Sequence, residues 1–147
     1  MTSQAGAMEP VLTLTDAPDR EAQKAIESGL SRFNTEKAGY SDHRDLAVLM
    51  SDPETKQVLG GLLGRTSLGL FFIDLFFVPD SLRGQRLGSR ILKLAEEEAQ
   101  RRGCRAAVLY TINFQAPGFY ERHGYRRFGE IACHPPGTTR IYLAKTL

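Results

Sequence analysis

The sequence predicts an α/β domain with a mixed, mostly antiparallel sheet flanked by helices, in the order βα(α)βββαβαββ. Two features of the chain indicate this class. Short apolar runs bounded by Gly, Pro and Asp are typical of buried strands, and they alternate with segments whose apolar residues recur at helical spacing. The length of 147 residues suits one domain, and 41% apolar with 24% charged residues is typical of a globular protein.

The part of the chain before residue 70 contributes the first three strands. Residues 1–8 are small and polar, so we expect a disordered N-terminus followed by a single domain at 9–147. Three glycines at 57–65 indicate close backbone approach or a bulge in that strand. The expected elements are a strand at 10–15, a helix at 18–31, a loop or short second helix at 34–44, and strands at 45–51 and 57–65.

The most informative stretch follows, where a buried strand at 70–78 leads into a loop at 83–89 and then a helix. The strand is almost wholly apolar but carries Asp74 at its middle. From Leu87 the apolar residues recur on one helical face, and the pattern ends at Gly103. The remaining expected elements are a strand at 106–111, a short helix at 115–123, and strands at 125–132 and 139–144.

Composition excludes several classes of protein. A net charge of +2 is too small to indicate a nucleic acid or an anionic membrane as partner. The start of the chain lacks the basic and apolar regions of a signal peptide, and its longest apolar run is too short to cross a bilayer. Two cysteines make no disulfide framework, and three scattered histidines have no metal-ligand spacing. We therefore expect a cytoplasmic protein with reduced thiols and no metal.

The loop and helix after strand 70–78 offer a site for an anionic phosphate chain. Backbone N–H groups at a helix N-terminus bind anions, and Arg83 and Arg86 add positive charge. The segment is neither the G-x-G-x-x-G of dinucleotide-binding proteins nor a P-loop. On these residues alone, a loop with two arginines that caps a helix is the alternative interpretation.

Two motifs together resemble the GNAT family of N-acetyltransferases. The run Arg-Gly-Gln-Arg-Leu-Gly at 83–88 resembles the family's Q/R-x-x-G-x-G/A, although Arg86 stands where the first motif glycine is usual. About thirty residues on, the run at 113–125 resembles N-x-x-A-x-x-F-Y-x-x-x-G-F/Y. The resemblance extends from about residue 11 to 143 and includes small, single-domain bacterial members. It implies the GNAT, or acyl-CoA N-acyltransferase, fold.

The resemblance also implies a donor and a place for it. Acetyl-CoA would supply an acyl group, its pantetheine arm pairing with the end of strand 70–78 where that strand splays from its neighbour. Its pyrophosphate would lie on backbone N–H groups of the loop at 83–89, which we call the phosphate loop. The residues implied to bind the donor are Phe77, Val78, Arg83, Gly84, Gln85, Arg86, Leu87, Gly88, Ser89 and Asn113.

Asp74 is the candidate base that removes a proton from the incoming amine, directly or through a water. Strand alternation predicts that it shares a face with Phe76 and Val78. In an apolar strand it would be desolvated, which favours a proton acceptor. The alternatives are that Asp74 binds a backbone group or acts as a plain counter-ion for the substrate ammonium.

Tyr120 matches the family's tyrosine and is the candidate acid for the leaving thiolate, with a packed core aromatic as the alternative role. The resemblance also implies a backbone N–H at Phe77 or Val78, freed by a bulge, as the donor to the oxyanion. No covalent acyl-enzyme is required, because neither Cys104 nor Cys133 has an evident activating partner.

The acceptor is expected to be a primary amine of a small molecule. The candidate residues for its pocket are Phe33, Asn34, Tyr40, His43, Tyr110, Thr111 and His134, the last with a surface-loop role as the alternative. A protein or peptide N-acetyltransferase and a non-catalytic acyl-CoA sensor are the rival functions. A homodimer is compatible with the family, but no motif specifies it.

Overall fold

The computed structural model describes residues 8–147 and divides the chain into two compact units, Met1–Tyr40 and Ser41–Leu147. The first unit contains helix α1 (Arg20–Ala38). Asp19 caps it, because its carboxylate accepts a hydrogen bond of 2.7 Å from the Ala22 N–H. Gly39, with φ of 90°, ends the helix in the left-handed conformation that glycine tolerates. Most of the predicted disordered N-terminus lies outside the described residues, and the single domain at 9–147 stays a prediction.

Two expectations about the first unit were wrong. Residues 10–15 form no strand; Val11, Leu12 and Leu14 are exposed, and a strand needs a hydrogen-bonded neighbour and a side to bury. Helix α1 is also longer than the expected 18–31, since residues 34–38 continue it. The described elements therefore begin with a helix and follow the order αβββαβαββ, apart from one 3-10 turn.

The second unit is built on one six-stranded sheet with the order β1-β2-β3-β4-β6-β5. Its strands are β1 (Arg44–Ser51), β2 (Val58–Ser67), β3 (Leu70–Phe77), β4 (Ala106–Ile112), β5 (Arg126–Ala132) and β6 (Thr139–Thr146). All neighbouring pairs are antiparallel except β3 and β4, which are parallel. This is the mixed, mostly antiparallel sheet that the sequence predicts.

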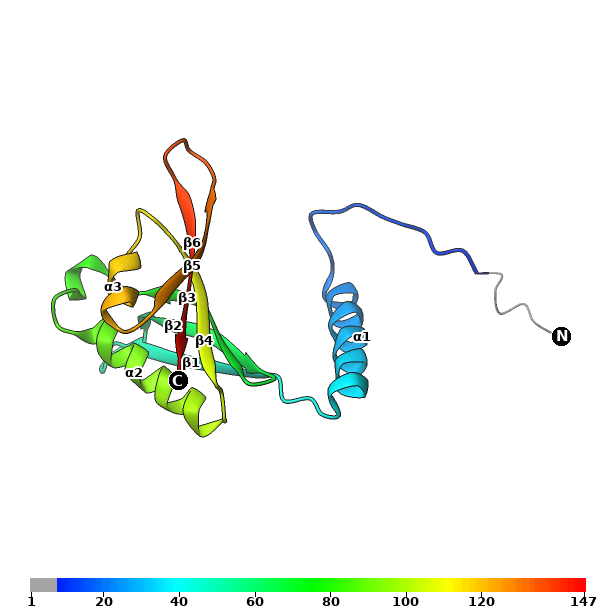
Figure 1. Ribbon diagram of the computed structural model, residues 1–147, viewed down its shortest axis with the longest axis horizontal. Helices are drawn as coiled ribbons and strands as arrows, with labels where there is room; N and C mark the ends of the chain where they lie inside the picture. Colours follow the sequence, from blue (N-terminus) through cyan, green and yellow to red (C-terminus); the bar gives the residue numbers. More distant parts are fainter. Residues whose placement is uncertain (1–7) are drawn as a thin grey trace. The chain divides into compact units, whose positions relative to one another are not determined.

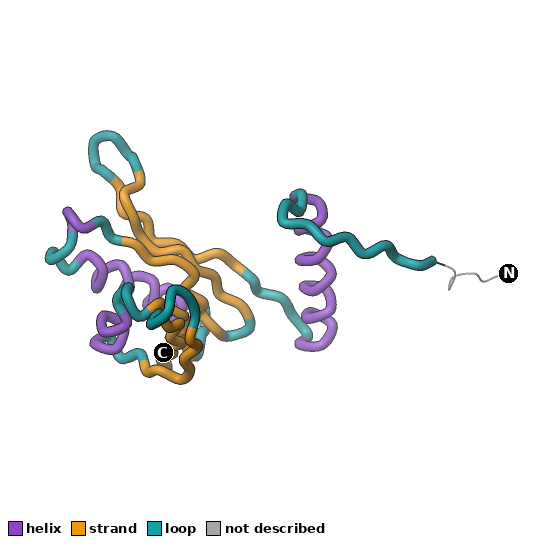
Figure 2. The backbone as a smooth tube through the Cα atoms, turned by 90° about the horizontal axis from the view of Figure 1, so that it is seen from above, coloured by secondary structure: helices purple, strands orange, loops and turns teal. Residues whose placement is uncertain are grey.

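Helices α2 (Leu87–Arg101) and α3 (Pro117–Arg122) lie on one side of this sheet (Figure 1), and η2 (Asp80–Leu82) is the 3-10 turn before α2. Figure 2 shows α2 running along the sheet. Ala95 and Ala99 are fully buried, because their small side chains let the helix approach the strands closely. Leu92 is buried, whereas Leu94 is exposed. The largest fully buried side chains are Phe71, Leu62, Leu92 and Leu143.

The glycines of β2 permit close packing with its neighbours, as the sequence predicts. Gly61 has φ of 138°, and a Cβ there would overlap the Val48 carbonyl oxygen of β1. A Cβ at Gly64 would lie 2.9 Å from the Phe71 ring of β3. Beside Gly64 the register of β2 on β3 shifts, because Leu63 pairs with Leu75 while Gly64 pairs with Ile73. The β3 residue left over is Asp74, so the bulge is centred on it.

No helix within residues 8–147 is long and apolar enough to cross a membrane. Over the same residues, no group of three or more His, Cys, Asp or Glu side chains is arranged to hold a metal ion.

Candidate active site

A gap between β3 and β4 lies at the centre of the candidate site. The two strands pair only where residues 70–72 face residues 106–108. Beyond that point β3 continues to Phe77 and β4 to Ile112 without pairing to each other. Residues 73–77 therefore present a strand edge toward the gap, and an extended ligand can pair with such an edge.

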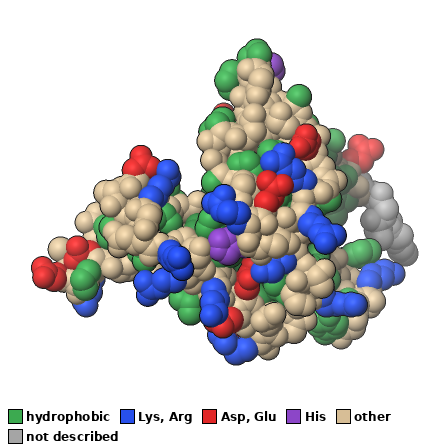
Figure 3. Space-filling view, turned by 60° about the vertical axis from the view of Figure 1, so that its left-hand side comes forward, with side chains coloured by type: hydrophobic (Ala, Val, Ile, Leu, Met, Phe, Trp, Pro, Cys, Tyr) green, Lys and Arg blue, Asp and Glu red, His purple; other side chains and the backbone are tan. Residues whose placement is uncertain are grey.

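The loop after β3 leads to a helix start that can hold an anion. The Arg83 Nε donates to the Val78 carbonyl at 3.1 Å, and its guanidinium pairs with Asp80 at 2.7 Å, which folds the loop back on the strand end. The backbone N–H groups of the first turn of α2 have no partner within the helix, and within residues 8–147 no side chain caps them. The side of the molecule where α3 and the start of α2 lie carries several Lys and Arg side chains (Figure 3). These features fit a pyrophosphate.

Arg86 is accommodated at the position of the motif glycine by its backbone. It adopts the left-handed conformation, with φ of 59° and ψ of 21°, immediately before α2. This conformation favours glycine but is open to other residues at a cost of about 1 kcal/mol. Gly88 has a packing role, since a Cβ there would lie 3.3 Å from the Phe119 ring of α3. Arg86 thus stands at the motif position in a backbone conformation that glycine adopts readily.

A histidine joins α3 to the start of α2. The His123 Nδ1 lies 2.9 Å from the Phe119 carbonyl oxygen, and its Nε2 lies 2.9 Å from the Ser89 Oγ. The ring also packs against the Phe119 ring, with 4.6 Å between centroids. The sequence predicts Ser89 in the phosphate loop, but its contact with His123 could not be predicted because the two residues are far apart in the chain.

Tyr120 is buried behind the end of β3, with 8% of its surface exposed. Its ring contacts those of Phe76, Phe119 and Tyr125 edge-on. Burial raises the pKa of Tyr120 to about 12, so the phenol keeps its proton at neutral pH. Within residues 8–147 its hydroxyl has no hydrogen-bond partner, and a buried donor without a partner is available to a ligand.

Asp74 differs from the expectation in two ways. The bulge interrupts strand alternation, so Phe76 and Val78 pack toward the core while the side chains of Asp74 and Leu75 are exposed. Asp74 is also not desolvated, because 45% of its side chain is exposed and its Oδ1 accepts a hydrogen bond from Arg65. The Arg65 guanidinium lies over the Phe72 ring, 4.5 Å from its centroid. The bulge expected near Phe77 or Val78 thus lies at Asp74, and Phe77 pairs with Gly61.

Comparison with known proteins agrees with this geometry. Residues 13–125 match the model of the acetyltransferase (GNAT) family. The chain belongs to the GNAT acetyltransferase family. An acetyltransferase of Agrobacterium fabrum is 39% identical over 132 residues, which is 90% of this chain and 96% of that protein.

Two further similarities support this assignment. Blasticidin-S acetyltransferase of Streptomyces morookaense is 41% identical over 95 residues, covering 64% of this chain and 70% of that protein. A solved structure described as an acetyltransferase from Agrobacterium tumefaciens gives a TM-score of 0.85 at 37% identity. It covers 94% of this chain and 100% of that one. The protein is therefore an N-acetyltransferase with the GNAT fold.

In this acetyltransferase, Asn113 has a structural role in addition to the one predicted for it. Its Nδ2 donates to the Gly137 carbonyl at 3.0 Å, and its Oδ1 accepts from the Thr139 N–H at 3.2 Å. Both amide heteroatoms thus connect the end of β4 to the turn before β6. Contact between Asn113 and the donor stays a prediction, as it does for Gln85, which is exposed in the loop.

Within the second unit, the acceptor candidates of this enzyme lie in different surroundings. Thr111 is buried and donates to the Gln115 Oε1 at 2.8 Å, whereas Tyr110 is exposed and contacts the Tyr142 ring. Because the two alternate along β4, they do not line one cavity as expected. His134 is exposed in the turn before β6. Phe33, Asn34 and Tyr40 belong to the first unit, and their contact with an acceptor stays a prediction.

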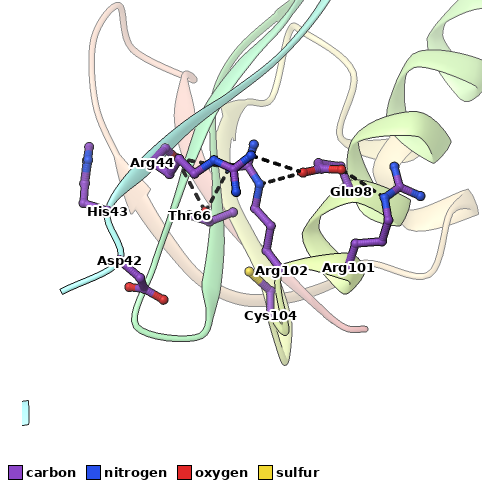
Figure 4. Close-up of a pocket in the computed structure, with 8 residues that line it drawn as sticks. All are labelled: Asp42, His43, Arg44, Thr66, Glu98, Arg101, Arg102 and Cys104. Carbon is purple, nitrogen blue, oxygen red and sulfur yellow. Dashed lines mark hydrogen bonds and ion pairs between the residues drawn. The ribbon is translucent and has the colours of Figure 1, made fainter. Parts of the chain in front are cut away.

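A cavity of about 410 Å³ lies beside the end of α2 (Figure 4), and no pattern in the sequence indicated it. Arg102 crosses it, donating to Glu98 at 2.8 Å and to the Thr66 Oγ1 and the Asp45 carbonyl at 3.1 and 3.0 Å. The residues around the cavity are Asp42, His43, Arg44, Thr66, Glu98, Arg101, Arg102 and Cys104. All three arginines form ion pairs with Glu98. Together with the hydrogen bonds of Arg102, these ion pairs connect α2 to β1 and β2. The cavity lies at the opposite end of α2 from the phosphate loop.

Proposed function

We propose that this enzyme transfers the acetyl group of acetyl-CoA to a primary amine of a small molecule, by direct attack while both substrates are bound. The observation that carries the proposal is the gap between β3 and β4, with an uncapped helix start beyond the end of β3. The hydroxyl of Tyr120, which has no hydrogen-bond partner among the described residues, lies on the α3 side of β3 and the carboxylate of Asp74 on the other.

The donor would be held by backbone more than by side chains. The N–H groups of Leu87, Gly88 and Ser89 point along the start of α2, where a pyrophosphate gains from the helix dipole. The open edge of residues 73–77 would pair with the amide groups of the pantetheine arm. Acetyl-CoA would supply the thioester whose carbonyl receives the amine. With this arrangement the thioester lies in the gap between the two strands.

Proton handling would be divided between two side chains. Asp74 would accept the proton that the ammonium must lose, at its Oδ2, while Arg65 holds Oδ1 and fixes the orientation of the carboxylate. Tyr120 would donate a hydrogen bond from its hydroxyl to the departing sulfur, since it remains protonated at neutral pH. Because the bulge places Asp74 on the face away from α3, the acceptor would enter from the side of Arg65 and Phe72.

A small-molecule acceptor is favoured over a protein by the relatives. The protein of Streptomyces morookaense, 41% identical over 95 residues, is named for acetylation of blasticidin S, a small molecule. The sequence similarity covers 64% of this chain, so the comparison supports a shared type of acceptor. A panel of small amines would identify this enzyme's own acceptor.

The test combines donor binding with turnover. Calorimetry should show that acetyl-CoA binds with micromolar affinity. In a colorimetric assay with a panel of small amines, the enzyme should release CoA thiol from acetyl-CoA only when an amine is present. Asp74→Asn should lower kcat/KM by about 10²- to 10⁴-fold, as expected for loss of a general base. Initial rates should give intersecting lines, because both substrates bind before reaction. No acetyl-CoA binding, or parallel lines with acetylated enzyme, would refute the proposal.

A further inference from the structure

We propose that His123 is a positioning residue for donor binding: it sets the direction of the Ser89 hydroxyl and takes up a proton when the pyrophosphate binds. The inference rests on the proposed function, because it takes the start of α2 as the donor site. It adds a residue outside the phosphate loop to the donor machinery. It also adds a proton to the binding equilibrium.

The hydrogen bonds of His123 fix which nitrogen carries the proton. A carbonyl oxygen can only accept, so the Nδ1 that lies 2.9 Å from the Phe119 carbonyl must be the N–H donor. In the neutral ring, Nε2 is then a bare acceptor. Ser89 Oγ lies 2.9 Å from it, so in this state the serine hydroxyl must donate to the imidazole.

This state is unfavourable for an anion at the start of α2. Ser89 is the third residue of the helix, within the turn whose N–H groups are free to bind an anion. While its hydroxyl donates to His123, only oxygen lone pairs remain to face a phosphate. If the ring is protonated, Nε2–H donates to Oγ instead and the hydroxyl proton turns to the phosphate. The imidazolium also adds a positive charge near the site.

The charged groups around this pair favour coupling to an anion. Glu121, two residues before His123 on α3, forms an ion pair with Arg127. Glu96 on α2 forms an ion pair with Lys145 and accepts a hydrogen bond from the Tyr125 hydroxyl. Lys145 of β6 lies beside Gly124, because its Cε is 3.4 Å from the position that a Cβ would take at this glycine. The other charged residues close in sequence to the pair are Arg86, Arg90, Lys93, Arg122 and Arg126. Because these are cations, an arriving pyrophosphate supplies the negative charge that favours the imidazolium.

The test measures protons directly. Acetyl-CoA is titrated into the wild-type protein at pH 7.5 and 8.5, where an ordinary imidazole is mostly neutral, in buffers of different ionisation enthalpy. We expect uptake of about 0.3 to 1 proton per donor bound, and by linkage a Kd about 2- to 10-fold weaker per pH unit. Acetyl-pantetheine, which lacks the pyrophosphate, should bind without this uptake.

Three variants separate positioning from a merely structural role. Ser89→Ala keeps the histidine but removes the hydroxyl, and His123→Gln keeps a polar side chain but removes the titrating ring. Both should bind acetyl-CoA without the proton uptake. Ser67→Ala is the matched control for loss of a hydroxyl, because Ser67 ends β2 next to Thr66, by the cavity at the other end of α2, and its loss should leave the uptake intact. Thermal denaturation of each variant verifies that it is folded.

The outcomes distinguish this inference from the proposed function. If the wild type binds acetyl-CoA but takes up no more protons than Ser89→Ala does, the role of His123 is overturned and the proposed donor site is not. The same proton uptake in His123→Gln would overturn it as well. Absence of acetyl-CoA binding in the wild type would instead refute the proposed function, and the inference with it.

Discussion

Replacing Tyr120 by Phe should separate activity from stability. Tyr120 is 8% exposed, and its hydroxyl has no hydrogen-bond partner within residues 8–147. Removing it breaks no hydrogen bond in the free protein, so the free energy of unfolding should stay constant or rise by up to about 1 kcal/mol. A hydrogen bond to the developing thiolate is worth about 1.5–3 kcal/mol, so kcat should fall about 10- to 150-fold.

The raised pKa of Tyr120 also limits what the phenol can do. It lies at about 12, whereas an ordinary thiol has a pKa near about 8.5. Complete proton transfer to the sulfur would therefore cost about 5 kcal/mol, at about 1.4 kcal/mol per pKa unit. A hydrogen bond that keeps the proton on Tyr120 carries no such cost. Ionisation of Tyr120 should then leave kcat unaffected between pH 7 and about 10.

Two measurements test this reasoning. Thiol release at saturating substrates gives kcat for the wild type and Tyr120→Phe, and urea denaturation gives the free energy of unfolding of each. A kcat within twofold of the wild type would remove Tyr120 from the mechanism. A loss of more than about 2 kcal/mol in stability would show that the hydroxyl is bonded within the fold, and the activity loss could no longer be assigned to the sulfur.

Two further predictions concern stability. Burial raises the pKa of both Tyr120 and Tyr125, so the folded state holds phenol protons that the unfolded chain loses above pH about 10. This stability is complete below pH 10 and declines by about 1.4 kcal/mol per pH unit for each tyrosine. In urea denaturation between pH 10 and 11, Tyr125→Phe should lose stability about half as steeply with pH as the wild type, because only Tyr120 still contributes. A slope equal to that of the wild type would contradict this prediction. Gly61→Ala, whose Cβ would overlap the Val48 carbonyl, should cost at least about 3 kcal/mol, whereas Gly29→Ala, with open space on α1, should cost none in thermal denaturation.

Local patterns in the sequence were sufficient to predict most of the second unit. The strand, loop and helix at 70–101 are specified by short-range features: an apolar run, a proline, then helical spacing. The expected strand at 10–15 failed because its three apolar side chains are a weak pattern without a neighbouring strand to pair with. Strand formation depends on partners elsewhere in the chain, whereas the capped helix α1 does not.

The environment of Asp74 shows what the sequence could not supply. The glycines of β2 indicated a bulge or close approach, but the position of the bulge depends on how β2 pairs with β3. One extra residue reverses which side chains face the core, so strand alternation was wrong beyond that point. The Arg65 partner was equally hidden, since it lies on another strand. The His123–Ser89 contact also depends on tertiary structure, because it joins α3 to α2.

The arrangement of the site bears on the choice between direct attack and an acyl-enzyme. Asp74 and Tyr120 lie on opposite faces of β3, and β3 and β4 separate beyond Phe72 and Val108. Removal of a proton from the amine and a hydrogen bond to the sulfur would then act from opposite sides of a carbonyl in that gap, an arrangement compatible with direct attack through a tetrahedral intermediate. An acyl-enzyme would need a nucleophile there. Cys104 is buried before β4 and burial raises the pKa of its thiol, while Cys133 lies after β5 beside Thr138. Cys104 precedes the paired end of β4, and β5 is separated from the gap by β6 and β4. Substitution of both cysteines by serine should therefore leave intersecting initial-rate lines, and a change to parallel lines would contradict direct attack.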